Sequence, residues 1–237
     1  MFSVIFELDP KAGQLDAYPG SAEELGGALA ETPGFVDNIR YRSLTREGRL
    51  LSLSSWRDEK SLVRWRTDPH HQDAEVKGRA EILSDYHLRV GQFTYDTQLP
   101  EGCELLEQRL DQTEAADGTA ITLIDASQSP EWTGARNPQE LATYLGFDHN
   151  SHGDCISWDV LEAIATPGAI LLFVLWKDQA SAMTFAQSAI VPDDARVRAI
   201  RVVRDYSMFD RREAPQFFPD ATGPVRGSGP PAAGQEP

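Results

Sequence analysis

Cysteine is scarce in this chain: Cys103 and Cys155 are the two occurrences among 237 residues. So few cysteines exclude a fold built on a disulfide framework and favour a reducing compartment. After Met1 the sequence enters "FSVIFEL" directly, without the basic start, hydrophobic segment and small-residue cleavage site of a signal peptide. We therefore expect a cytoplasmic protein.

Long apolar runs and basic residues are also in short supply. The longest apolar run, Ala169 to Trp176, is far below the roughly 20 residues that a bilayer-spanning helix needs, which excludes a membrane protein of that kind. Lysine and arginine number 22 against 37 aspartates and glutamates, so the formal net charge is −15. Because nucleic-acid binding depends on basic side chains that replace counterions, nucleic acid is not expected as a partner.

The sequence contains none of the short motifs that mark common cofactor-dependent and hydrolytic enzymes. It has no glycine-rich phosphate loop, dinucleotide fingerprint, G-x-S-x-G elbow or H-E-x-x-H helix. A nicotinamide or flavin enzyme of the usual kinds is therefore disfavoured.

What the sequence does contain is an internal repeat. "WRDEKS" begins at Trp56 and "WKDQAS" at Trp176, and "DY" occurs at 85–86 and again at 205–206, both at an offset of 120 residues. Self-similarity at a fixed offset is the signature of a structural unit used more than once. The chain is therefore predicted to hold two copies of one unit.

Both copies show the same predicted order of strands and helices. In the first copy, strands are expected at 3–8, 35–44, 50–56 and 85–95, and helices at 21–32, 59–68 and 71–83. In the second copy, strands are expected at 120–125, 155–164, 169–176 and 196–206, and helices at 137–146 and 178–189. Expected helix caps are Ser21, Asp58 and Asn137. Each copy is thus a βαββαβ, ferredoxin-like unit of the α+β class.

The repeat also predicts how the chain is divided. Residues 1–98 form the first unit, 99–118 an irregular connector or short helix, and 119–213 the second unit. Residues 214–237 are rich in Pro, Gly and Ala and are expected to be a disordered tail. Because a sheet with helices on one face needs cover on the other, the two sheets should pack together as an intramolecular dimeric α+β barrel.

The run "LLSLSSWRDEKSLVRWRTDPHHQDAEVKGR", followed by "DYHLRV", resembles the antibiotic biosynthesis monooxygenase family of dimeric α+β barrel proteins. In that family a strand ends in tryptophan, a basic residue and Asp or Ser, and a second tryptophan follows nine residues later, here Trp65. The resemblance covers residues 1–97 closely and the second unit more loosely. It implies a cofactor-independent oxygenase acting on polycyclic aromatic phenols, a haem-degrading oxygenase, or a protein without an assigned substrate.

The haem-degrading branch of that family can be compared position by position. Trp65 matches its helical tryptophan, but its axial histidine falls on Glu75 and its asparagine near Val4 or Ile5. In the second unit the corresponding tryptophan and histidine positions hold Phe185 and Ala195. The resemblance therefore disfavours haem degradation by that mechanism unless another histidine binds the iron.

His71 and Trp65 are the candidate catalytic residues. A His71 imidazole at the mouth of a pocket suits a general base for a phenolic or enolic substrate, since its unperturbed pKa is about 6.5. Trp65 would form an aromatic wall, although Leu62 and Trp65 also share the helix face that packs on a sheet. Further candidates for binding in a pocket are Trp56, His70, Tyr86, Trp158 and Trp176. For each of them, simple packing or solvent exposure is the alternative.

A second cluster, "DHNSHGDCISW", brings His149, His152 and Cys155 together at spacings of three. His149 and His152 are the candidate metal or haem ligands, but a structural zinc site normally collects its ligands in two separated pairs. A polar loop that enters a strand is the alternative.

These observations favour a small cofactor-independent monooxygenase acting on an aromatic or polyketide-like molecule. The alternatives are a haem-binding or haem-degrading protein and a non-catalytic module that binds a small ligand. Because the single chain already holds two units, a monomer is one alternative, while the family resemblance favours a homodimer.

Overall fold

The computed structural model describes residues 1–14, 26–127 and 137–218 of the chain. The first half contains β1 (Phe2–Pro10), β2 (Phe35–Ser43), β3 (Leu50–Trp56), α2 (Glu59–Arg66), α3 (Pro69–Lys77), a π-helical turn η1 (Gly78–Ile82) and β4 (Leu83–Asp96). The second half contains β5 (Ala120–Ser127), α4 (Pro138–Tyr144), a 3-10 turn η2 (His149–Ser151), β6 (Cys155–Ala163), β7 (Ala169–Trp176), α5 (Gln179–Ser188) and β8 (Arg196–Ser207). The predicted α+β class is confirmed.

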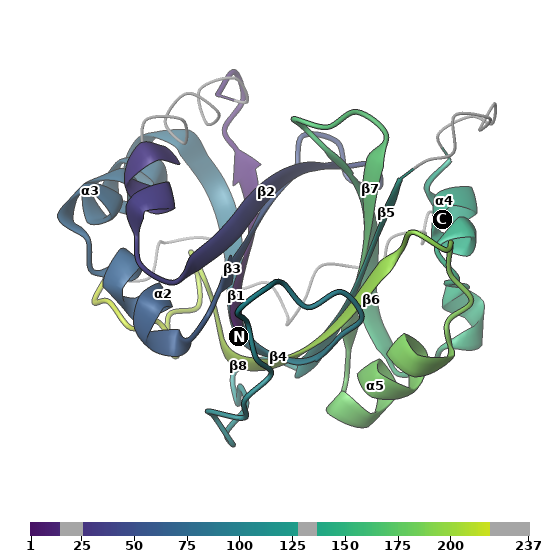
Figure 1. The fold of residues 1–237 in the computed structure, drawn as a ribbon. Coiled ribbons are helices and arrows are strands. Elements are labelled where there is room, and N and C mark those ends of the chain that lie inside the picture. Colours follow the sequence, from purple (N-terminus) through teal and green to yellow (C-terminus); the bar gives the residue numbers. More distant parts are fainter. Residues whose placement is uncertain (15–25, 128–136, 219–237) are drawn as a thin grey trace.

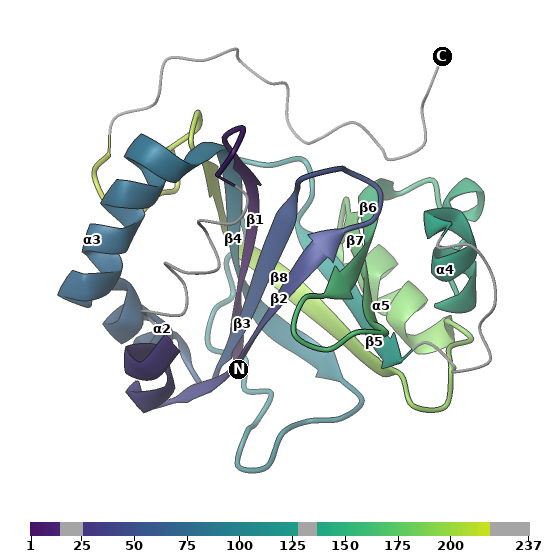
Figure 2. The ribbon, with the colours of Figure 1, turned by 90° about the horizontal axis from the view of Figure 1, so that it is seen from above.

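All eight strands join in one closed antiparallel barrel with the order β1-β3-β2-β6-β7-β5-β8-β4. Two junctions connect the halves: residues 41–43 of β2 pair with 161–163 of β6, and residues 87–96 of β4 pair with 198–207 of β8. Helices α2 and α3 cover one side of the barrel and α4 and α5 cover the opposite side (Figures 1 and 2). The predicted intramolecular barrel is confirmed, and closure pairs the strand edges that two separate sheets would leave open.

The local signals that recur at an offset of 120 residues fold alike in the two halves. Gly48 and Gly168 end the two hairpin turns at φ values of 79° and 85°, a left-handed conformation that glycine adopts without steric cost. Asp58 caps α2 by accepting from the Ser61 backbone N–H at 2.7 Å, and Asp178 caps α5 in the same way from Ser181 at 2.8 Å. Each half thus contains its own residues that specify the hairpin turn and the start of the helix.

The two Asp-Tyr pairs, in contrast, are not equivalent in the fold. Tyr86 lies near the start of β4, whereas Tyr206 lies near the end of β8. The β4–β8 pairing brings Leu88 opposite Tyr206, so the two tyrosines approach one another from different halves of the chain. The offset of 120 residues is therefore wrong as a structural alignment of the last strands.

The barrel interior is closed by apolar side chains and by buried ion pairs. Alternation along β1 sends Ile5 and Glu7 inward and leaves Val4 and Phe6 facing the helices. At one end, the fully buried Arg89 bonds to the carboxylates of Glu7 and Asp205. The packed barrel interior therefore stabilises the fold, and a cavity lies between the outer face of the barrel and the helices.

Several sequence expectations need correction. Residues 99–118 form turns and irregular chain, with no helix. Residues 214–218, expected in a disordered tail, pack against the first unit, while 219–237 lie outside the described residues. The predicted helix at 21–32 falls partly outside them as well; residues 26–31 are helical, and the Ser21 cap cannot be placed. Among the described helices, none has the length and apolar character needed to cross a bilayer.

Candidate active site

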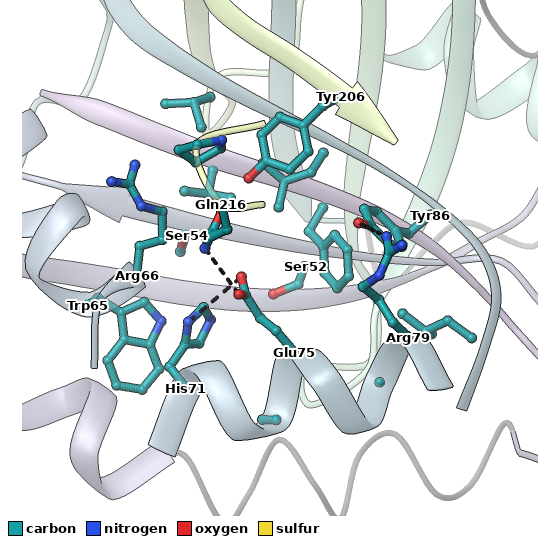
Figure 3. A pocket seen from close by; sticks show the side chains of 18 of the residues that line it. Ser52, Ser54, Trp65, Arg66, His71, Glu75, Arg79, Tyr86, Tyr206 and Gln216 are labelled. Atoms are coloured by element: carbon teal, nitrogen blue, oxygen red, sulfur yellow. Dashed lines mark hydrogen bonds and ion pairs between the residues drawn. The ribbon is translucent and has the colours of Figure 1, made fainter. Parts of the chain in front are cut away.

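A cavity of about 220 Å³ lies between the outer face of the first-half strands and the helices α2 and α3. Its apolar and aromatic lining residues are Val4, Phe6, Leu29, Leu62, Trp65, Ala74, Gly78, Ile82, Leu83, Tyr86, Leu88, Val90, Tyr206, Pro215 and Phe218. Its polar lining residues are Asn38, Arg40, Ser52, Ser54, Arg66, His71, Glu75, Arg79, Arg211 and Gln216. Figure 3 shows several of these side chains converging from the sheet, from α2 and α3, and from the segment after β8. Apolar walls with a few polar groups are typical of a small-molecule site.

Small polar residues on the strands keep this space open. Asn38 pairs with Ser54 across β2 and β3, and at the same register in the second half Trp158 pairs with Val174. Trp158 and Val174 are buried in the apolar core of the second half, together with Leu172, which stands where the first half has Ser52. The second half has therefore filled the volume that the first half keeps hollow.

Trp65 and His71 meet in the cavity as the sequence predicted. Their ring centroids lie 4.8 Å apart, with Trp65 contributed by α2 and His71 by α3. The Nδ1 atom of His71 is buried without a hydrogen-bond partner and lies 3.9 Å from Oε1 of Glu75. Burial lowers the pKa of His71 below its ordinary value, so the imidazole is neutral near pH 7 and is able to accept a proton.

Glu75 is a site residue that the sequence analysis considered only as a poor haem ligand. Its Oε2 atom accepts a hydrogen bond of 3.1 Å from Nε2 of Gln216. Burial raises the pKa of Glu75 to about 7, against the opposing effects of Arg211, Arg66 and Arg79. The spacing of four residues from His71 on one helix was the signal available, since such residues share a face. The cavity thus holds a neutral imidazole beside a carboxyl group whose pKa is about 7.

Tyr86 is the third polar centre, at the opposite end of the cavity from Trp65 (Figure 3). Its hydroxyl accepts hydrogen bonds from Nη1 of Arg79, at 2.7 Å, and from Nη1 of Arg211. Burial raises the pKa of Tyr86, so the phenol keeps its proton. Because both acceptor positions of the oxygen are occupied, its O–H remains available as a donor.

The segment after β8 closes the cavity. The guanidinium groups of Arg79 and Arg211 each lie 5.4 Å from the ring centroid of Phe218, and Nη2 of Arg211 donates to the Gln216 carbonyl at 3.3 Å. The sequence analysis missed Gln216 and Phe218 because composition placed residues 214–237 in a tail. The aromatic pair at 217–218, set within Pro- and Gly-rich surroundings, was the signal overlooked.

Two other predicted residues of the first half lie outside the cavity. Trp56 is 1% exposed and packs edge-on against Phe35 at 5.4 Å, while its indole N–H donates to Ser54 Oγ at 3.0 Å. The side chain of His70 is 81% exposed and lies 3.4 Å from Asp68. Trp56 therefore belongs to the core and His70 to the surface.

The second-half candidates gather in that half's aromatic core. The rings of His149 and His152 stack on Trp158 and Phe147 at 5.8 Å and 5.4 Å, and Trp176 donates to Thr122 Oγ1 at 3.0 Å. These residues lie across the barrel from the cavity, so neither histidine reaches it. In the described parts of the chain, no three His, Cys, Asp or Glu side chains gather as metal ligands would.

Comparison with known proteins agrees with the motif around Trp56 and Trp65. A relative from Pyricularia oryzae named jasmonate monooxygenase ABM is 39% identical over 227 residues, which cover 94% of this chain and all of the relative. A model of the antibiotic biosynthesis monooxygenase family matches residues 1–77. The chain belongs to the antibiotic biosynthesis monooxygenase family. An uncharacterised protein of Bacillus subtilis, YqjZ, is 31% identical over 91 residues, covering 38% of this chain and 75% of that protein.

Two solved structures are also similar to this chain. An anthrone oxidase-like protein is 11% identical with a TM-score of 0.35, covering 91% of this chain and 96% of that one. A structure described as an antibiotic biosynthesis monooxygenase is 17% identical with a TM-score of 0.35, covering 38% of this chain and 95% of that one. The membership that the run beginning at Leu50 predicted is confirmed through the curated relative and the family model.

Proposed function

We propose that this protein is a small monooxygenase that works without a tightly bound cofactor on an aromatic or polyketide-like molecule in the first-half cavity. Family membership supports the reaction class. The observation that carries the site is the neutral His71 imidazole, with its Nδ1 unpartnered in a mainly apolar cavity beside Trp65 and Glu75.

The chemistry follows from what a base can do in such a cavity. His71 Nδ1 removes a proton from a phenol or from a methylene group next to a carbonyl, and the resulting anion transfers electrons to dioxygen. When the methylene group becomes a carbonyl group, one oxygen atom enters the product and the other leaves as water with the two hydrogens. The substrate thus supplies all four electrons that reduce dioxygen, and no external reductant is needed. Glu75, with a pKa of about 7, accepts or returns the proton.

Tyr86 supplies the complementary group. Since Arg79 and Arg211 occupy both acceptor positions of its oxygen, its O–H donates to the substrate oxygen on which negative charge develops. The base and the donor come from α3 and β4, so a flat molecule between them touches both.

The name of the Pyricularia oryzae relative favours jasmonate as a second candidate substrate. Jasmonate is a cyclopentanone carboxylic acid whose C–H bonds beside the ketone are weakly acidic, so the same base chemistry applies to it.

Oxygen uptake tests the function directly. Purified protein is supplied with anthrone or jasmonate in an oxygen electrode, and the products are identified by mass spectrometry. We expect uptake with at least one compound, and a fall in kcat of about 10²- to 10⁴-fold in His71→Gln. The matched control is His70→Gln, whose side chain is exposed outside the cavity and whose loss should leave kcat unchanged. Binding of either compound without oxygen uptake would instead identify a non-catalytic ligand-binding module.

A further inference from the structure

The cavity is strongly cationic within an acidic protein. Among the described residues that line it, Arg40, Arg66, Arg79 and Arg211 are basic and Glu75 is the acidic one. The chain as a whole carries a formal net charge of −15. A local excess of guanidinium groups in a mainly apolar enclosure is costly unless something negative joins them, because a low dielectric strengthens their mutual repulsion.

Two of these arginines retain unused hydrogen-bond donors. The Nε atoms of Arg66 and Arg211 are buried, and neither has a hydrogen-bond partner. Both guanidinium groups line the cavity together with Glu75 and Tyr206, and both oppose the rise in pKa of these two side chains. Arg211 is held in place by bonds from Nη1 to Tyr86 and from Nη2 to Gln216, which leaves Nε preorganised for a ligand.

We propose that the cavity selects small apolar substrates that carry a carboxylate, and that Arg66 and Arg211 bind this carboxylate. This proposal rests on the proposed monooxygenase function, and it adds the chemical class of the substrate. A guanidinium group matches the planar carboxylate geometry and forms short, charge-assisted hydrogen bonds with it. The remaining apolar walls bury the rest of the molecule.

Protonation of Glu75 offsets the negative charge that a bound carboxylate brings into the cavity. A carboxylate bound beside it raises its pKa above the value of about 7 that it has in the empty cavity, so it takes up a proton when the substrate enters. The charged groups that face Glu75 are Arg66 on α2, Arg79 on η1 and Arg211 after β8, and the neutral imidazole of His71 faces it from its own helix. The cavity therefore keeps its overall charge balance when the anion binds.

The test compares acids with their methyl esters in the absence of oxygen. Calorimetric titrations use two pairs, jasmonate with methyl jasmonate and 2-naphthoate with methyl 2-naphthoate, so that no turnover occurs. We expect at least one acid to bind at least tenfold more tightly than its ester. In Arg66→Gln and Arg211→Gln, the affinity for that acid should fall at least tenfold, while the affinity for the ester stays within twofold.

Arg57→Gln is the matched control, since it removes one positive charge from an exposed residue outside the cavity. It should leave both affinities unchanged. Arg211→Lys keeps the charge but removes the Nε donor, and it should recover part of the loss. Circular dichroism of each variant verifies that the fold is retained.

Equal binding of acids and esters overturns the proposal, as does the absence of binding by both acids. Parallel losses for acid and ester in the arginine variants would mean that these residues only brace the cavity, and would overturn it as well. Oxygen uptake with neutral anthrone, together with no preference for acids, would keep the monooxygenase and refute the carboxylate site. Acid-selective binding without oxygen uptake would do the reverse.

Discussion

Arg211, which follows the last strand of the second unit, donates a hydrogen bond to the hydroxyl of Tyr86, which lies near the start of the last strand of the first unit. The cavity of the first unit is thus completed by residues that the second unit delivers. An isolated first unit would lack Tyr206, Arg211 and Gln216 and would have an open cavity.

Truncation after Ala214 tests this dependence. It removes Gln216 and Phe218 but keeps Arg211 and Glu213, and Glu213 binds the Asp205 backbone and Thr113. We expect kcat/KM for the best substrate to fall about tenfold, mainly through KM, because each tenfold loss is about 1.4 kcal/mol of binding. Truncation after Phe218 is the comparison, since it keeps every described residue of the cavity. Equal kinetics for the two truncations would contradict the closing role of residues 215–218.

Tyr86→Phe separates donation to the substrate from packing. The variant keeps the ring and loses the O–H, so kcat should fall by about 10²-fold while KM changes little, as is found when one donor to a developing oxyanion is removed. Two guanidinium groups also lose an acceptor, which should lower the unfolding free energy by about 1–2 kcal/mol. Tyr144→Phe, whose hydroxyl bonds to Ser127 in the second unit, is the control for loss of a phenol O–H. An unchanged kcat in Tyr86→Phe would remove it from the mechanism.

Glu75→Gln should make stability less sensitive to pH. The pKa of Glu75 is raised from about 4.3 in the unfolded chain to about 7 in the fold, so the folded state holds the proton more tightly. Wild-type stability is therefore lost as pH rises from about 4.5 to 7, by about 2–3 kcal/mol relative to the variant. Urea denaturation of both proteins from pH 5 to 8 measures the difference. A constant offset across that range would show that Glu75 does not titrate there.

His71 affects the pH dependence of stability in the opposite direction to Glu75 and over a different pH range. Its pKa is lowered in the fold, so the charged form is disfavoured and stability is lost as pH falls below about 6.5, the unfolded value. In activity, the acid limb of kcat/KM should lie below pH 6.5 if His71 is the base, and near pH 7 if Glu75 is. The pH profile of Glu75→Gln decides between them: a retained acid limb below 6.5 assigns the base to His71.

Arg89 in the barrel interior offers a test of the scaffold. Arg89→Met removes the buried cation that the carboxylates of Glu7 and Asp205 share, which should cost about 3–5 kcal/mol of unfolding free energy. The loss should shrink at acid pH as the carboxylates become protonated. Arg212→Met, at an exposed pair with Asp210, should leave stability unchanged within error. Comparable losses in the two variants would contradict the assigned role of the buried pair.

The sequence predicted the scaffold well because its signals are local. Asp58 and Asn137 cap helices, and Gly48 and Gly168 end turns, through contacts within a few residues. Trp65 and His71 were also found, because they lie on neighbouring helical segments of one unit. In each case the residues that specify the structure are close together in the chain.

The rest of the site depends on contacts between distant segments. Tyr206, Arg211 and Gln216 reach the cavity through the β4–β8 junction, and the offset between the two Asp-Tyr pairs concealed this by suggesting equivalence. The distinction between Trp56 in the core and Trp65 in the cavity depends on which way each ring turns once the helices have docked. Asn38 and Trp158 occupy the same register position in the two halves, where Asn38 leaves a space and Trp158 fills it. This equivalence depends on strand register, which is set only when the sheet is assembled.

Covalent joining of the two barrel halves also removes a constraint that identical subunits cannot escape. In a symmetric pair, any substitution that enlarges or fills one hollow does the same to its mate. Here Trp158, Phe185 and Trp176 fill the core of the second half, while the first half keeps a cavity in the corresponding place. Substitutions can therefore change the two halves independently, so that the second half stabilises the barrel while the first half forms the cavity.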